Sequence, residues 1–207
     1  MNRPLPRTAL YGLALALTLT GCATKYDYSN YRAHFPRSIL VLPPLNETTD
    51  VNATYGYLST VTYPIAEMGY YVYPVVVADH FFKENGMPTP GEMHQAPPKK
   101  IYEIMGADAV LYVTLKQYGS KYQLISSKTA VEAQCKLVDT RTEVLLWEGK
   151  VIAEEGSGGG LFGAALSQVI NQAADHAHDV AVRANVQYTV EGKGLLYGPL
   201  SPKYQNQ

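Results

Sequence analysis

The chain has 207 residues, of which 46% are hydrophobic, and a formal net charge of -1 at pH 7. This near-neutral balance argues against nucleic acid as a partner and gives the chain as a whole no electrostatic attraction to anionic lipid. The chain has two cysteines, Cys22 and Cys135, which are too few for a cysteine-rich metal site. Because Cys22 is predicted below to be modified, no pair of thiols is left for an internal disulfide.

Residues 1–21 are predicted to be a cleaved leader. Arg3 and Arg7 precede a mostly apolar run from Ala9 to Leu19, as the charged and hydrophobic regions of a secretory signal do. The run is shorter than the roughly 20 apolar residues that a helix needs to span a bilayer. It ends in Leu19-Thr20-Gly21-Cys22, which resembles the bacterial lipobox, with cleavage between Gly21 and Cys22. An ordinary cleaved signal that happens to precede a cysteine is the alternative.

The lipobox resemblance implies that Cys22 carries a thioether-linked diacylglycerol and an acylated amino group, with chains such as palmitate. Each buried methylene contributes about 0.8 kcal/mol, so three chains would hold the protein to a membrane essentially permanently. The next residue is Ala23, whereas lipoproteins kept in the inner membrane often carry aspartate there. We therefore expect a lipid-anchored protein on the periplasmic face of the outer membrane.

Residues 22–37 are predicted to form the lipidated cysteine and a flexible tether. About 14 residues of extended chain reach roughly 50 Å, so the domain should work close to its membrane. Tyr26, Tyr28 and Tyr31 fall within this tether. Of the 17 tyrosines, only Tyr11 lies in the leader. One small core cannot bury all the others with every hydroxyl hydrogen-bonded, so some should lie at the surface. We expect these three tyrosines to contact a partner or lipid headgroups.

Residues 38–191 are predicted to form a single α/β periplasmic domain. The apolar run from Ser38 to Leu42 indicates a strand that is buried on both faces and closed by Pro43. Apolar residues then recur at helical spacing, and Gly69 is expected to end that helix. Further strands are predicted at 70–77 and 109–113, with helices at 78–85 and 99–105. Two strand-helix-strand crossovers imply three parallel strands.

The second half of the domain follows a different pattern. Strict alternation from Val131 to Leu137 predicts a strand with Cys135 on its buried face, where the thiol would act as a small hydrophobe. A turn at 139–142 and a strand at 144–153 complete an antiparallel meander. A long amphipathic helix over 162–184 is expected to pack on this mixed sheet, and residues 192–207 are expected to form an irregular tail.

Two segments carry residue types that suggest ligand binding. The glycine-rich stretch Gly156 to Gly160 could place backbone N–H groups around an anion, but it lacks the ending of a phosphate-binding loop, and a flexible linker is favoured. Asp175 to Asp179 is the densest group of metal-ligand types. His176 and His178 would point about 200° apart on a helix, so a solvated helical face is favoured. We expect neither a metal nor a cofactor.

A long loop is predicted from Gly86 to Pro98, and such loops are often functional. Pro90, Glu92 and His94 in this loop are candidate partner contacts, as are Tyr197 and Tyr204 in the tail. A hydrolase acting through His80, His94 or Glu92 would require these groups to converge on a common point. The chain contains no nucleophile or metalloprotease motif, so we expect no enzyme.

Several motifs resemble those of a family of bacterial outer-membrane lipoproteins of unknown function. They are the lipobox, Lys83 to Gly86, Pro90 to His94 and Gly106 to Tyr112. More distantly, three segments are similar to the periplasmic domain shared by the curli-secretion channel lipoprotein, the amino-terminal domain of the Tol propeller protein and a lipoprotein activator of peptidoglycan synthase. These segments are Ile39 to Thr48, Leu137 to Thr140 and Leu145 to Trp147. The resemblance implies an α/β domain that binds and assembles rather than catalyses.

The predicted function is that of a non-enzymatic accessory or scaffold subunit in an envelope complex for secretion, transport or cell-wall assembly. Its expected partners are the membrane, through the acyl chains on Cys22, and envelope proteins that include other lipoproteins. Self-association into a homo-oligomer stays open. The alternative is a small-ligand-binding auxiliary lipoprotein of a transporter, with a pocket of at least about 300 Å³ under the 86–98 loop.

Overall fold

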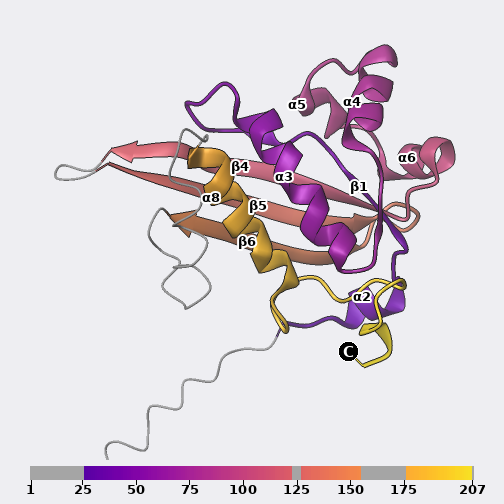
Figure 1. Cartoon of the computed structure of the whole chain (residues 1–207). Coiled ribbons are helices and arrows are strands. Elements are labelled where there is room, and N and C mark those ends of the chain that lie inside the picture. Colours follow the sequence, from indigo (N-terminus) through magenta and orange to yellow (C-terminus); the bar gives the residue numbers. More distant parts are fainter. Residues whose placement is uncertain (1–25, 123–126, 155–175, 207) are drawn as a thin grey trace, which may run out of the picture.

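The structure of the chain is a computed structural model that describes residues 26–122, 127–154 and 176–206 (Figure 1). Several predicted features lie outside the described residues: the leader with Gly21, Cys22, the glycine-rich stretch at 156–160 and Asp175. The part of the helix predicted over 162–184 that precedes residue 176 also lies outside them. No helix within the three described ranges is long and apolar enough to cross a membrane.

The domain is built on one mixed sheet of six strands in the order β3-β1-β4-β5-β6, with β2 also paired to β4. The strands are β1 Ser38–Val41, β2 Leu45–Asn46, β3 Tyr71–Val72, β4 Ala109–Tyr122, β5 Ser127–Asp139 and β6 Leu145–Glu154. β1 is parallel to β3 and to β4, and β2 is parallel to β4. β4, β5 and β6 form an antiparallel meander. The predicted mixed α/β sheet is therefore confirmed.

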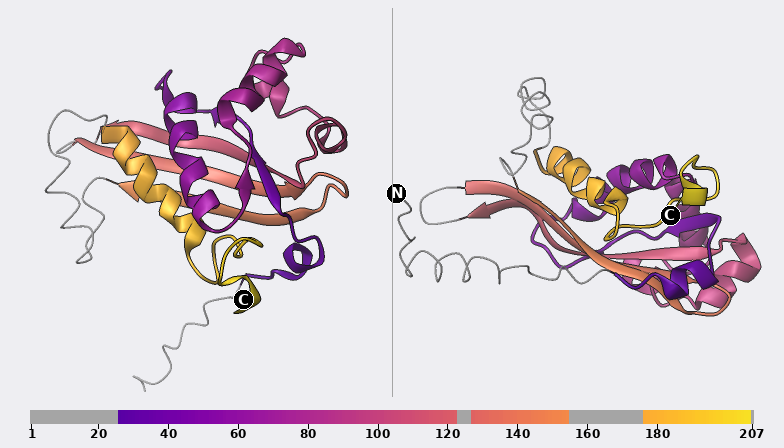
Figure 2. Two further views of the ribbon diagram at one scale, coloured as in Figure 1. Left: turned by 45° about the vertical axis from the view of Figure 1, so that its right-hand side comes forward. Right: turned by 90° about the horizontal axis from the view of Figure 1, so that it is seen from below.

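Helices cover the two faces of this sheet unequally. On β1, Ile39 and Val41 belong to a large core cluster that includes apolar residues of α3 Ala53–Glu67 and α8 His176–Asn185. The alternate residues Leu40 and Leu42 face a smaller cluster with α4 Val75–Glu84, α5 Pro90–Met93 and α6 Pro98–Met105. Figure 2 shows α3 and α8 side by side along one face, while much of the opposite face of β5 and β6 is uncovered.

The prediction of a second strand over residues 70–77 is wrong over most of that range. Only Tyr71 and Val72 form β3, at the edge of the sheet, and α4 begins at Val75. Pro74, the residue before α4, has no N–H to donate to a sheet, so the chain leaves the strand there. The apolar side chains of Val76 and Val77 are consequently 77% and 63% exposed on the helix instead of buried in the sheet.

Glycines end two helices at the predicted positions. α3 continues past Pro64 to Glu67 and is followed by Gly69 at φ +90°, and α6 ends at Gly106 at φ +73°. Both glycines adopt the left-handed conformation that residues with a Cβ rarely adopt. A Cβ on Gly69 would also lie 2.3 Å from the backbone nitrogen of Ser201, because the C-terminal tail crosses the end of α3 at this point.

The predicted tether does not extend to residue 37. α2 Ser29–Ala33 packs against the domain, with Tyr28 only 4% exposed and Tyr31 fully buried. The hydroxyl of Tyr28 donates to the carbonyl of Gly194 over 2.6 Å, and the hydroxyls of Tyr31 and Tyr70 are hydrogen-bonded at 2.7 Å. Both rings enter the core because their hydroxyls find partners there. The expectation that Tyr28 and Tyr31 are exposed contacts is therefore wrong.

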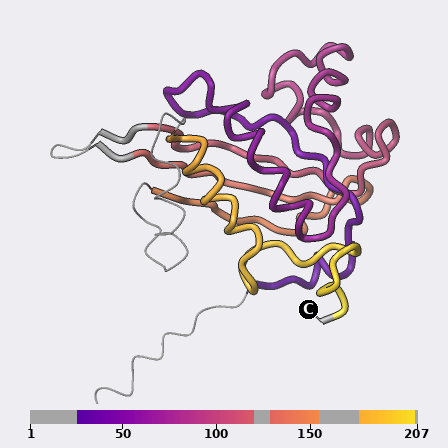
Figure 3. Tube along the Cα trace, viewed as in Figure 1, coloured from indigo at the N-terminus to yellow at the C-terminus, as the bar shows by residue number. Residues whose placement is uncertain are grey.

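The C-terminal tail is irregular, as predicted, but it is packed in place. After the short 3-10 helix η1 Val186–Thr189, the tail buries Leu195 and Leu196 and closes with η2 Tyr204–Asn206. Its backbone N–H groups at Gly198 and Leu200 donate to the carbonyls of Met68 and Gly69 over 2.8 and 3.1 Å. Figures 1 and 3 show this tail beside α2, so the two ends of the described chain meet at one end of the domain.

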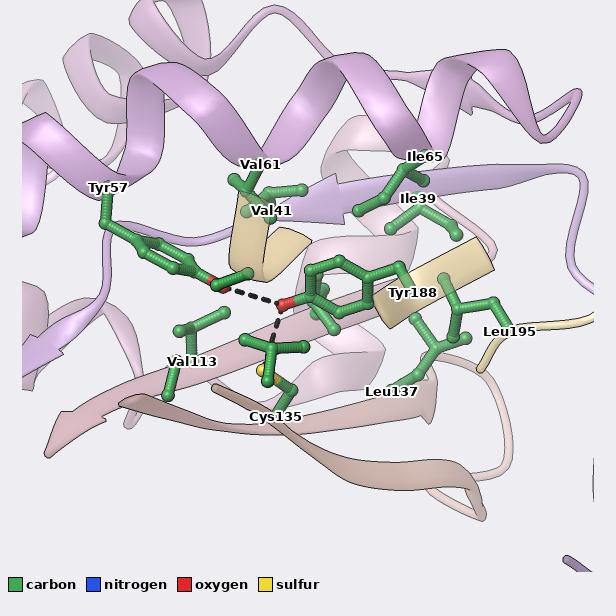
Figure 4. Close-up of a cluster of buried hydrophobic side chains, with 14 of the residues drawn as sticks. Ile39, Val41, Tyr57, Val61, Ile65, Val113, Cys135, Leu137, Tyr188 and Leu195 are labelled. Atoms are coloured by element: carbon green, nitrogen blue, oxygen red, sulfur yellow. Dashed lines mark hydrogen bonds between the residues drawn. The ribbon is translucent and has the colours of Figure 1, made fainter. Parts of the chain in front are cut away.

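A chain of buried hydrogen-bonding groups crosses the main core (Figure 4). The hydroxyl of Tyr188 lies 2.9 Å from the Cys135 sulfur and 3.1 Å from the Tyr57 hydroxyl. Cys135 is 1% exposed, on the predicted buried face of β5, and its burial raises the pKa of the thiol to about 12. A neutral, enclosed thiol has little nucleophilic character, which agrees with the prediction that Cys135 is a packing residue.

Candidate functional site

An apolar groove lies between α4 and α6, beneath the segment predicted to be a long loop. Its volume is about 240 Å³. The apolar lining includes Phe81, Phe82, Met87, Ile101, Ile104 and Met105, and the polar lining is Asn85 and Lys100. Phe82 and Ile101 are almost fully buried at its base, whereas Ile104 is 62% exposed at its rim.

The polar groups at this groove are already engaged. The side-chain amide of Asn85 donates to the carbonyl of Phe81 over 2.7 Å, and the ammonium of Lys100 lies 2.6 Å from a carboxylate oxygen of Glu103. Both groups keep further hydrogen-bonding capacity, but the rest of the lining is apolar. The groove therefore suits an apolar side chain better than a polar small molecule.

The segment at 86–98 is held in shape by a helix cap. Thr89 and Glu92 form a capping box, in which the Thr89 hydroxyl accepts from the Glu92 backbone N–H and the Glu92 carboxylate accepts from the Thr89 backbone N–H. Pro90 occupies the first turn of α5, where its missing N–H costs nothing. Of the predicted contact residues, Pro90 and Glu92 thus have clear local structural roles.

His94, in the same segment, contacts residues at the sheet. Its Nε2 lies 2.9 Å from the carbonyl oxygen of Pro43, and its ring meets the ring of Tyr112 edge-on with centroids 5.3 Å apart. Burial lowers the pKa of His94, and the hydrogen bond to Pro43 offsets this only in part. The imidazole is therefore neutral at pH 7 and donates its Nε2 proton to the carbonyl.

The three groups of the hydrolase hypothesis each have a different environment. His80 is exposed on α4, Glu92 caps α5, and His94 binds the carbonyl of Pro43. These local contacts do not direct the three groups toward a common point where a substrate could react. Among the described residues there is also no group of three or more histidine, cysteine, aspartate or glutamate side chains that could hold a metal ion.

We predict that His94 makes the fold less stable as the pH falls below about 6.5. The unfolded chain takes up a proton near the ordinary histidine pKa, whereas the folded chain does so only at its lowered pKa, so the free energy of unfolding decreases across that window. Urea unfolding at pH 7 and about 5.5 measures this loss. His94→Gln should reduce the loss, and His80→Gln, at an exposed position of α4, is the matched control. An unchanged pH dependence in His94→Gln would contradict the assignment.

A second groove, of about 370 Å³, lies between α3 and α8. Its lining includes Tyr63, Pro64, Val182 and Val186, with Glu67 and His178 as the titratable residues. The hydroxyls that border it donate within their own helices, as Ser59 does to Gly56 and Thr189 to Val186. This groove is larger than the one at α4 and α6, but it is far from the 86–98 segment that sequence reasoning singled out.

The remaining predicted tyrosines gather at the end of the domain where α2 and the tail meet. The Tyr26 hydroxyl accepts from the backbone N–H of Glu148 over 3.0 Å, and the Tyr204 ring lies edge-on against Phe35 with centroids 4.9 Å apart. Tyr197 is half-buried, with the ammonium of Lys203 5.1 Å from its ring centroid. The structure therefore brings Tyr26, Tyr197 and Tyr204 to one end, although they lie far apart in the sequence.

The exposed apolar residues at α6 were missed by sequence reasoning. The signal was present, because Ile101, Ile104 and Met105 follow the i, i+3, i+4 spacing of a helical stripe. Ile101 is buried in the smaller core cluster and Met105 packs against that cluster, whereas Ile104 on the same stripe is 62% exposed. Apolar spacing in the sequence predicts which residues share a face of the helix. It does not show which of these residues the neighbouring elements cover.

By its relatives the chain falls in a class of proteins described as lipoproteins. It belongs to the GNA1162-like family, whose description is "Putative lipoprotein GNA1162-like" and whose model matches residues 26–200. The chain is 41% identical over 203 residues to "Putative lipoprotein NMB1124/NMB1162" of Neisseria meningitidis serogroup B, covering 92% of this chain and 94% of that protein. Membership in a lipoprotein family, predicted from the motifs, is confirmed.

The solved structure of a family relative supports the same fold. The crystal structure of lipoprotein GNA1162 from Neisseria meningitidis aligns with a TM-score of 0.56 at 45% identity, over 66% of this chain and 97% of that chain. The PelC dodecamer from Paraburkholderia phytofirmans aligns with a TM-score of 0.44 at 14% identity, over 72% and 84% of the two chains. The second likeness is too remote to bear on partners or assembly.

Proposed function

We propose that the protein is an outer-membrane lipoprotein that acts as a non-enzymatic accessory or scaffold subunit of an envelope complex. Acyl chains on Cys22 would anchor it to the periplasmic face, and envelope proteins, including other lipoproteins, would be its partners in secretion, transport or cell-wall assembly. Support comes from its membership in a lipoprotein family and from the lipobox-like sequence before Cys22.

The observation that carries the docking role is the apolar surface at α4 and α6. Ile104 is 62% exposed and lines a groove of about 240 Å³ between these two helices. An apolar partner surface that covers such side chains gains about 25 cal/mol for each Å² of apolar area removed from water. Exposed apolar groups beside a preformed groove are typical of protein interaction sites.

The groove at α4 and α6 supports a protein partner better than the small-ligand alternative. Its volume of about 240 Å³ is below the roughly 300 Å³ expected of a small-molecule site, and its polar groups are engaged. The α3–α8 groove, at about 370 Å³, does reach that size and keeps the ligand-binding alternative open. A ligand there would be contacted by Glu67 and His178, and Glu67→Gln should then weaken its binding.

Site-specific photo-crosslinking tests the docking role in cells. A photoreactive residue at position 104 of the full lipidated chain should give discrete crosslinked products that mass spectrometry identifies as envelope proteins. The same residue at position 51 is the matched control, because Val51 is 87% exposed on the loop before α3 and borders neither groove. Crosslinking at position 104 that is no stronger or more specific than at position 51 would contradict the proposal.

A further inference from the structure

The link between the proposed lipid anchor and the folded domain is short. Tyr26 is hydrogen-bonded to β6 through the Glu148 backbone N–H, and Tyr28 is 4% exposed with its hydroxyl bound to the tail. The chain from Cys22 to Tyr26 therefore spans four residue steps, which reach about 14 Å when fully extended. The end of the domain that holds Tyr26 can move no further than this from the anchor point.

Basic residues are in slight excess at that end of the domain, although the whole chain is near neutral. Residues 26–37 and 191–206 together contain four basic residues, Arg32, Arg37, Lys193 and Lys203, and two acidic residues, Asp27 and Glu191, and Glu148 lies beside Tyr26. All seven side chains are exposed. Each basic residue near an anionic membrane surface contributes about 1 kcal/mol of attraction, and the effect fades within a Debye length of roughly 10 Å. The short link keeps these groups within such a range.

The same end also presents partly exposed aromatic and apolar side chains. Tyr26, Phe35 and Tyr204 are half-buried, and the buried rings of Tyr28 and Tyr31 join them in a series of contacts with centroids 4.8 to 6.2 Å apart. Leu200 is 78% exposed, on a tail segment whose backbone is hydrogen-bonded to Gly69. Tyrosine is enriched at the level of lipid headgroups, and an exposed leucine beside it can enter the boundary of the acyl chains.

We propose that the end formed by α2 and the C-terminal tail is a membrane-contact surface that binds anionic lipid headgroups and holds the domain in one orientation. This inference rests on the proposed lipid anchor at Cys22. α3 then points away from the bilayer, since its C-terminal end lies against the tail at Gly69. Its 15 residues are about 22 Å long, so the loop at Val51 is held well clear of the lipid.

Fluorescence quenching by lipid tests this orientation on the full lipidated chain. The protein is reconstituted into vesicles of phosphatidylethanolamine and phosphatidylglycerol that carry a quencher at headgroup depth. A fluorophore is attached to Leu200→Cys or, as the matched control, to Val51→Cys. Labelling is specific because Cys135 is 1% exposed and Cys22 is blocked by its thioether. We expect quenching at position 200 to exceed quenching at position 51 several-fold.

Charge reversal provides the second arm of the experiment. Lys203→Glu combined with Arg32→Glu should reduce quenching at position 200 without releasing the protein from the vesicles. If the protein floats with the vesicles but positions 200 and 51 are quenched equally, the orientation is overturned and the anchor stands. If the protein does not float, the anchor itself fails.

Discussion

Replacement of residues 1–21 by a conventionally cleaved secretory leader, combined with Cys22→Ala, should transfer the protein from the membrane to the soluble periplasmic fraction essentially completely. Without the cysteine there is no sulfur to carry diacylglycerol, and the described residues contain no membrane-spanning helix that could replace the anchor. Two acyl chains already give stable attachment, whereas a few basic groups give only weak and salt-sensitive binding. Fractionation of cell envelopes followed by immunoblotting measures the change.

Cys135→Ala is the control for this experiment. It removes the other thiol of the chain at a buried site, so it should leave the protein in the membrane fraction. If the Cys22→Ala protein with the conventional leader loses that leader and still stays with the membrane after a high-salt wash, attachment comes from something other than acyl chains. The proposed anchor would then be wrong.

Tyr188→Ala should lower the free energy of unfolding by about 3–5 kcal/mol, the range found when a large buried ring is removed. Tyr188 is fully buried and lies at the centre of the main core, where its ring packs 5.8 Å from the ring of Trp147 (Figure 4). Its loss also leaves the Tyr57 hydroxyl without the partner that it has at 3.1 Å. Denaturant unfolding of the purified domain measures the effect.

Tyr188→Phe separates the contribution of the hydroxyl to stability from that of the ring. The ring is kept, and the cost should fall to about 1–3 kcal/mol, because only the hydrogen bonds to Tyr57 and Cys135 are lost. Tyr63→Ala, at a position that is 71% exposed, should change the stability by less than about 0.5 kcal/mol. A Tyr188→Ala variant as stable as Tyr63→Ala would refute the assignment of Tyr188 and its hydrogen-bonded partners, Tyr57 and Cys135, to the core.

The elements that sequence reasoning placed correctly are those whose determinants are local. Ile39, Leu40 and Val41 place apolar side chains on both faces of the strand, and β1 is buried along its whole length. Gly69 and Gly106 adopt the left-handed backbone that ends a helix. Alternation around Cys135 gave both the strand and the buried face, because a period of two residues fixes which side chains share a face.

The elements that were missed depend on contacts between distant parts of the chain. Tyr28 and Tyr31 lie in a polar segment that has the composition of a linker, but Tyr28 binds a carbonyl 166 residues away. The valines at 75–77 have strand propensity, yet Pro74 and the edge position of β3 place them on a helix. Local composition carries no information on such partners.

The groove between α4 and α6 is not lined by the contact residues predicted in the 86–98 segment. Sequence reasoning singled out Pro90, Glu92 and His94, and the structure gives Glu92 and His94 capping and hydrogen-bonding roles. The apolar groove depends on how α6 packs against α4, which no local pattern specifies. Figures 1 and 2 place α4 and α5 on the opposite side of the domain from α2 and the tail, so the proposed membrane contact would leave this groove open to periplasmic partners.

Mass spectrometry of the intact protein, extracted from the envelope of cells that make the full chain, is the most direct measurement. The account predicts a chain that starts at Cys22 and carries the added mass of a diacylglycerol and an amide-linked acyl chain. An unmodified N-terminal residue, or a chain that still contains residues 1–21, would contradict the proposed anchor and, with it, the orientation of the domain at the membrane.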